Sequence, residues 1–205
     1  MSRRRVIYVP AAAAAISIGR SNSASVSGAG TSLSVGWASG GAAANGTWLI
    51  AVTRVTNGTG TITGGSAWTQ IGSTGVYYKQ AGASEPTTYS VAYSGSSKSD
   101  GVVVTICEVI GASSMESSAP ATNTSTSPSV TSTAAGDCVV VAMSHSSAAA
   151  TITPPTGYTK QSSVSETSAF LASAIGTKLN VGSGTIAPGA WNASYSTLVS
   201  LAFKP

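Results

Sequence analysis

Short runs of apolar and β-branched residues alternate along the chain with clusters of glycine, serine and asparagine. This alternation predicts short antiparallel strands separated by turns. No stretch of about eleven residues keeps the i, i+3, i+4, i+7 apolar spacing of an amphipathic helix, so we expect no long helix. The expected strands are residues 33–37, 47–55, 60–63, 67–72, 76–80, 87–93, 102–109, 129–133, 138–145, 150–153, 157–163, 168–175, 191–195 and 197–203.

The two halves of this strand series resemble each other. At a constant offset of 90 residues, Thr-Ile-Thr recurs and the aromatic residue that follows it five positions later also recurs. The coinciding positions are Gly46 and Gly136, Trp48 and Cys138, residues 49–52 and 139–142, residues 61–63 and 151–153, Trp68 and Tyr158, Thr69 and Thr159, and Ser73 and Ser163. With insertions, residues 87–93 match 189–195, and residues 101–109 match 196–204. We interpret this pattern as an internal duplication.

The chain is therefore expected to be all-β, a jelly-roll-like antiparallel β-sandwich spanning residues 29–205. Its pseudo-repeats are residues 31–111 and 129–204, and the polar segment 112–128 is predicted to be a loop that joins them. A unit of about 80 residues buries a modest share of its surface, which favours pooling both repeats in one sandwich. The alternative is two tandem immunoglobulin-like sandwiches.

Composition narrows the choice of function. Serine, alanine, threonine and glycine make up 117 of the 205 residues, and only 16 residues are charged. An ordinary soluble domain has about 25 % charged residues, and coiled coils have more. No run of about 18 apolar residues is present, so we expect no membrane-spanning helix and no membrane partner.

The chemically reactive residues are too few for a typical active site. There is one histidine, His145, without a carboxylate near it in sequence, and there is no Gly-x-Ser-x-Gly motif. Cys-x-x-Cys, paired histidines and acidic calcium loops are absent as well. We therefore expect no enzyme activity, no catalytic residue, no metal site and no cofactor. Cys107 and Cys138 stand in apolar strands and are expected to be buried free thiols.

Four aromatic residues are expected to anchor the core, because Trp48 begins an apolar strand and aromatics at equivalent positions of a duplication, such as Trp68 and Tyr158, mark packing sites. They are Trp48, Trp68, Tyr158 and Trp191. The alternative is that the tryptophans stack on sugars.

The N-terminal residues 1–28 are expected to form a docking arm. Three of the ten cations form the run at residues 3–5, and without this run the net charge falls from +4 to +1, so no basic face for nucleic acid is expected. The arginines would pair with acidic groups of a partner, and the apolar residues after them would add a strand to an exposed sheet edge. The predicted partner-binding residues are Arg3, Arg4, Arg5, Ile7, Tyr8 and Val9. A secretory leader is the alternative, but Pro10 interrupts its apolar stretch.

Four segments together resemble a family. Trp-Thr-Gln-Ile-Gly (68–72), Val-Tyr-Tyr-Lys-Gln-Ala (76–81), Glu-Pro-Thr-Thr-Tyr (85–89) and Pro-Pro-Thr-Gly-Tyr-Thr (154–159) are similar to a pattern in small virion proteins of tailed bacteriophages. The resemblance covers residues 31–204. The first repeat departs from the pattern, since Gly-Gly-Ser-Ala-Trp (64–68) stands where two prolines are expected.

The resemblance implies a non-enzymatic structural protein of the virion surface. We expect a capsid decoration or cement protein that binds the capsid lattice through its arm and is assembled in the host cytoplasm. Its partners would be the major capsid protein or tail proteins, in a homo-oligomer or multi-copy assembly. One alternative is a tail or fibre module that binds host-surface glycans, and another is a secreted adhesin or carbohydrate-binding module.

Overall fold

The computed structural model describes residues 14–147, 151–192 and 196–205, and this part of the chain consists of strands and turns. The expectation of an all-β, antiparallel fold is confirmed. Among these residues there is no helix of the length and hydropathy needed to cross a membrane.

The first repeat forms a five-stranded sheet covered by a three-stranded one. The large sheet has the order β1-β8-β3-β6-β5, and the smaller sheet has the order β2-β7-β4. The bounds are β1 Ser17–Ser27, β2 Gly30–Gly36, β3 Trp48–Val55, β4 Thr61–Thr63, β5 Thr69–Gln70, β6 Val76–Gln80, β7 Thr88–Gly95 and β8 Gly101–Ile110.

The second repeat forms a matching five-stranded sheet, in the order β13-β14-β12-β17-β9, and two short ribbons, β10-β16 and β11-β15. The bounds are β9 Ser114–Thr124, β10 Thr126–Ser127, β11 Val130–Ser132, β12 Asp137–His145, β13 Thr159–Glu166, β14 Leu171–Val181, β15 Gly184–Ile186, β16 Gly189–Ala190 and β17 Ser196–Lys204. Read from the other end, its order matches that of the first sheet strand for strand, which supports the duplication.

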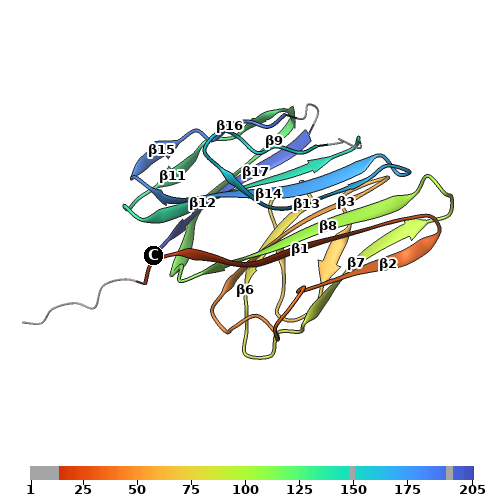
Figure 1. Cartoon of the computed structure of the whole chain (residues 1–205), viewed down its shortest axis with the longest axis horizontal. Helices are drawn as coiled ribbons and strands as arrows, with labels where there is room; N and C mark the ends of the chain where they lie inside the picture. Colours follow the sequence, from red (N-terminus) through yellow and green to blue (C-terminus); the bar gives the residue numbers. More distant parts are fainter. Residues whose placement is uncertain (1–13, 148–150, 193–195) are drawn as a thin grey trace, which may run out of the picture.

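The two large sheets pack face to face (Figure 1). Ile50, Cys107 and Val109 of the first repeat share one apolar cluster with Val140, Leu201 and Phe203 of the second. Strand β1 lies beside β13, and β8 lies beside β14, so the equivalent strands β1 and β9 are at opposite flanks. The molecule is therefore a stack in which each repeat contributes one large inner sheet and one small outer layer.

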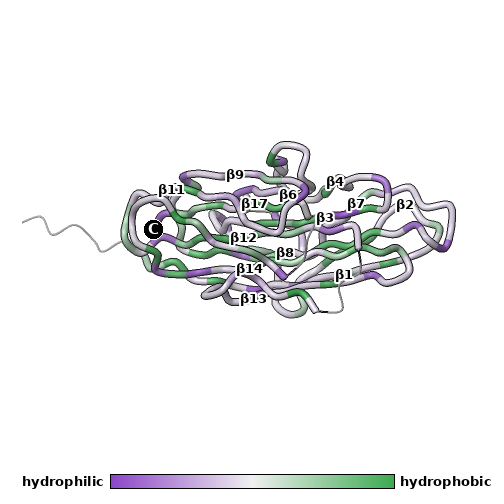
Figure 2. The backbone as a smooth tube through the Cα atoms, turned by 90° about the horizontal axis from the view of Figure 1, so that it is seen from above, coloured by the Kyte–Doolittle hydropathy of each residue, from purple (hydrophilic) through white to green (hydrophobic). Residues whose placement is uncertain are grey.

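Strands β8 and β12 are buried along almost their whole length because both faces of each strand are covered. In β12, Val140 packs in the shared central cluster, whereas its neighbour Val141 packs against the outer layer of the second repeat. A strand buried on both faces reads as a continuous apolar run instead of an alternating one. Figure 2 shows hydrophobic residues concentrated in central strands such as β12, whereas the edge strand β9 is paler.

The structure corrects the alignment of residues 101–109 with 196–204 by one position. Ile50 pairs with Cys107, and Val140, its equivalent at an offset of 90, pairs with Leu201. Cys107 therefore corresponds to Leu201, an offset of 94, where the sequence match implied Ala202. A slip of one residue turns a strand's side chains to the other face, and Cys107 and Leu201 do share the central cluster.

The prediction that residues 112–128 form a loop is wrong, because most of this segment forms β9 and β10. Strand β9 pairs only with β17 in its sheet. An edge strand tolerates polar residues and a proline such as Pro120, since one of its sides has no strand partner.

The prediction of a docking arm over residues 1–28 is also corrected, because residues 17–27 are strand β1, which pairs with β8. Both edge strands lack the apolar pattern that marks the buried strands.

The arrangement combines features of the two architectures considered from the sequence. Each repeat has its own pair of layers, yet the repeats share a core. Residues 151–153 and 191–192, expected in strands, lie outside any strand. The jelly-roll assignment itself stays a prediction.

Candidate functional site

The predicted docking residues of the arm lie outside the described part of the chain. They are Arg3, Arg4, Arg5, Ile7, Tyr8 and Val9. The described chain starts at Ala14, and Ile16, which follows closely, is buried in the central cluster. The fold therefore holds the chain firmly from Ile16 onward.

The four predicted core anchors all pack against apolar clusters. Trp191 is 3 % exposed, and its indole N–H donates to Ser127 Oγ. Trp48 is half-buried, donates to the carbonyl of Ala112 and lies 5.7 Å from the ring of Phe203. Trp68 and Tyr158 are half-buried at equivalent positions, each below a lysine ammonium. The structure brings these aromatics into three different clusters and not into one site.

The most strongly charged buried cluster is built around Glu85. Lys79 Nζ lies 2.7 Å from Glu85 Oε2, and the two side chains are 1 % and 0 % exposed. Tyr89 Oη also donates to Oε2, while Oε1 accepts from Ser66 Oγ and from the backbone N–H groups of Ser66 and Gly82. The lysine also donates to the carbonyls of Gly64 and Ser66. Every polar atom of this cluster has a partner.

The surroundings keep Glu85 ionised. Burial alone would raise the pKa of Glu85, but hydrogen bonds from Lys79, Ser66 and Gly82 outweigh it and lower the pKa to about 2. Burial lowers the pKa of Lys79, and its contact with Glu85 opposes that shift. Because every donor and acceptor of this ion pair already bonds within the protein, none is left to bind a substrate. The cluster instead fastens loops 64–66 and 82–85 to β6.

A second ion pair fixes strand β1. Arg20 Nη2 lies 2.6 Å from Glu108 Oε1, and Arg20 also donates to the carbonyls of Ser39 and Gly41. Its guanidinium stacks 4.8 Å from the centroid of Trp37. The arginine therefore ties the first strand both to β8 and to the loop that precedes β3.

The remaining carboxylates serve turns and strand ends. Asp100 accepts from the backbone N–H groups of Ser96 and Ser97, and Asp137 accepts from Ser132 Oγ at 2.6 Å. Glu116 binds Thr133, and Glu166 binds the N–H of Ser168. Among the described residues, no three His, Cys, Asp or Glu side chains gather in a metal-binding group. The described acids thus act inside the fold, singly or with one cation.

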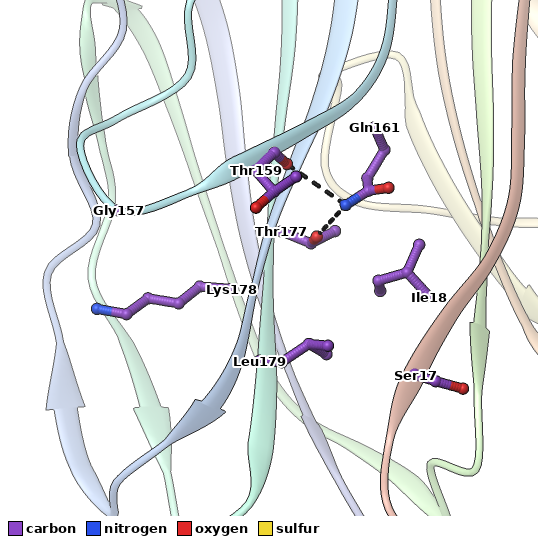
Figure 3. Close-up of a pocket in the computed structure, with 8 residues that line it drawn as sticks. All are labelled: Ser17, Ile18, Gly157, Thr159, Gln161, Thr177, Lys178 and Leu179. Atoms are coloured by element: carbon purple, nitrogen blue, oxygen red, sulfur yellow. Dashed lines mark hydrogen bonds between the residues drawn. The ribbon is translucent and has the colours of Figure 1, made fainter.

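A surface groove of about 540 Å³ opens where β1 and β13 separate. Ser17 and Ile18 form one wall, and Thr159, Lys178 and Leu179 form the other (Figure 3). Gln161 donates to Thr177 Oγ1 at 2.6 Å across its floor. Sequence reasoning missed this groove, because its residues come from strands that are far apart in the sequence.

The buried cysteines carry a prediction about reactivity. Cys107 and Cys138 are free and fully buried, and burial raises the pKa of both thiols, that of Cys138 to about 12. Because the thiolate is the reactive form, we expect neither thiol of the folded protein to react with Ellman's reagent at pH 8. Both should react at once in guanidinium chloride. Rapid labelling of a cysteine in the folded protein would contradict the burial described here.

Comparison with known proteins places the chain in no group. No protein-family model, no curated protein and no solved structure matches it.

Proposed function

We propose that the protein is a non-enzymatic structural protein of a bacteriophage virion, present in many copies and docked on neighbouring subunits by its N-terminal segment. The observation that carries the proposal is the fastening of the chain from Ile16 onward. Strand β1 is held by antiparallel pairing with β8 along its length and by the Arg20–Glu108 ion pair. Residues 1–13, with three arginines and the apolar Val-Ile-Tyr-Val, are thereby joined to a rigid body.

The use of charged groups inside the fold supports a structural role. All six carboxylates bind groups of the protein itself, and the described part contains no open cluster of nucleophile, base and orienting acid. Catalysis requires such groups to face a substrate. The proposed partners are the major capsid protein or tail proteins, the proposed place is the virion, and the leading role is that of a decoration or cement protein.

The strand order of the first repeat supports a jelly roll within that repeat, whereas the sequence suggested one jelly-roll-like sandwich made of both repeats. In the first repeat, the first strand lies beside the last in one sheet, and the second lies beside the next-to-last in the other. This alternation between sheets is the pattern of a jelly roll, an architecture of many viral capsid proteins. Fold alone does not fix function, so the proposal depends on the arm.

Deletion of residues 2–13 tests the role of the arm. We expect the shortened protein to be lost from particles and to keep its melting temperature, because β1 starts only at Ser17. Incorporation is measured by quantitative mass spectrometry of purified particles. Replacement of the same residues by a glycine–serine segment of equal length is the control for chain length. Normal occupancy of either variant would overturn the proposal.

A further inference from the structure

Each repeat has a lysine over an aromatic ring at the same place in the fold. Lys79 pairs with Leu49 across β6 and β3, and Lys178 pairs with Val139 across β14 and β12. Leu49 and Val139 are equivalent at the offset of 90 residues. The ammonium of Lys79 lies 4.5 Å from the centroid of Trp68, and that of Lys178 lies 5.9 Å from the centroid of Tyr158.

The carboxylate of the first repeat has no counterpart in the second. Glu85 fits beside Lys79 because Gly65 has no side chain, and a Cβ atom on Gly65 would collide with Glu85 Oε2. The residue equivalent to Gly65 is Pro155, which is buried. The second repeat therefore has a buried proline in place of the glycine that leaves room for the glutamate in the first.

Lys178 is consequently exposed and unpaired with any acid of the described chain. Its ammonium lies near Gly157, where a Cβ atom would be 3.9 Å from Nζ, at the end of the groove. Figure 3 shows its side chain directed toward Gly157 and away from Gln161. The lysine that is neutralised by a carboxylate in the first repeat is thus exposed in the second, beside a groove without a carboxylate in its lining.

The groove also has two open strand edges. Strand β13 starts at Thr159, which pairs with Thr177, so Lys178 and Leu179 lack a strand partner on that side of β14. On the opposite wall, Ser17 and Ile18 pair only with β8. Farther along, Ser21 and Ser23 donate to the carbonyls of Gln161 and Ser163 and close the gap between the strands. The opening is therefore confined to the groove.

We propose that the groove binds an extended acidic segment of a partner protein, with a carboxylate of that segment on the ammonium of Lys178. An apolar neighbour of that carboxylate packs against Ile18 and Leu179, which is 38 % exposed, and its backbone bonds to the open strand edges. The inference deepens the proposed function, since it names what a neighbouring virion subunit presents to this protein.

A peptide fits these walls better than a sugar does. Sugar sites commonly present an open aromatic face, but the ring of Tyr158 is half-buried and the ammonium of Lys178 lies over it, 5.9 Å from its centroid. The unpaired backbone groups and the apolar pair Ile18 and Leu179 instead suit an extended chain with alternating acidic and apolar residues.

Amide chemical shifts of the isotope-labelled full-length protein test the proposal. The probe is the peptide acetyl-Val-Glu-Val-Glu-amide, and its Gln counterpart is the matched neutral probe. We expect the acidic peptide to shift the amide signals of Gly157, Lys178 and Leu179 and to bind about tenfold more tightly than the neutral one, as a charge-assisted hydrogen bond requires. Lys178→Met should remove this preference, whereas Lys98→Met, at an exposed loop position, should keep it.

Two outcomes would overturn the proposal. One is equal binding of the two peptides or no shift at the groove. The other is a stronger response of the same amides to sialyllactose than to the acidic peptide, which would assign the groove to an anionic glycan. Neither outcome bears on the deletion of residues 2–13, so failure of this inference and failure of the proposed function are distinguishable.

Discussion

Replacing Glu85 by alanine should lower the free energy of unfolding by about 3–5 kcal/mol, the usual cost of removing one partner of a buried ion pair. Lys79, whose side chain is 1 % exposed, would then be left without a counterion. Tyr89 Oη and the N–H groups of Ser66 and Gly82 would lose their acceptor as well. Urea denaturation followed by tryptophan fluorescence measures the loss.

Two companion variants separate the pair from its surroundings. Glu116→Ala removes a half-buried carboxylate that bonds to Thr133 and has no cation partner among the described residues, and it should cost only about 1 kcal/mol. The double variant Lys79→Met/Glu85→Leu removes both charges and should recover most of the stability lost in Glu85→Ala, because an apolar pair needs no counterion. A Glu85→Ala protein as stable as the unmodified chain would show that the ion pair is not buried in solution.

The same glutamate predicts a pH dependence. Its pKa is lowered in the fold from 4.5 to about 2, so the carboxylate stabilises the folded state above the unfolded pKa. That contribution is lost as the pH falls from about 5 toward 2. The unmodified protein should therefore lose stability over this range more steeply than Glu85→Gln, which has no carboxyl group there to protonate. Parallel curves for the two proteins would contradict the assigned shift.

Phe203→Ala should destabilise both repeats together, by about 3–5 kcal/mol, as expected for a large side chain removed from a core. Phe203 is 0 % exposed, lies on β17 of the second repeat and contacts Trp48 of the first. A cavity at this point lies in the core that the two large sheets share. Hydrogen exchange of the amides in β3 and in β12 should therefore accelerate by the same factor.

A substitution confined to one outer layer tests the same cooperativity from outside the shared core. Ile62→Ala removes a buried side chain from the cluster between β4 and the first large sheet. This substitution should lower the free energy of unfolding by about 2–5 kcal/mol. Amide exchange should again become faster in both repeats, because we expect the whole chain to unfold in one cooperative step. Faster exchange in only one repeat after Phe203→Ala would show that the repeats unfold independently.

The sequence predicts the buried strands better than the exposed ones, for a physical reason. The runs at 102–109 and 138–145 are apolar because neighbouring layers cover both of their faces. Strand β1 and strand β9 are half-exposed edge strands in which serine, alanine and threonine predominate, so their composition resembles that of loops. Edge position is a property of the assembled sheet, and no local pattern encodes it.

The site residues were harder to predict than the fold. Lys79 and Glu85 are separated by six positions and meet because a tight loop returns the chain to β6, whereas the sequence marks Glu85 only as a turn residue before Pro86. The groove arises from Ser17 and Lys178, which are distant in sequence. The offset of 90 residues shows that Gly65 is replaced by Pro155, but it places Lys79 on Ala169. The equivalence of Lys79 and Lys178 emerges only from their strand pairing with Leu49 and Val139.

The shared core between β3, β8, β12 and β17 makes one polypeptide equivalent to a dimer that cannot dissociate. Two separate sandwiches with the same apolar faces would associate according to their concentration. The covalent tether between the repeats keeps the faces together at any dilution. The tether also allows the two repeats to carry different residues, since a mutation in one repeat does not change the other. The divergence of Lys79 and Lys178, one enclosed and one outward, is a product of that freedom.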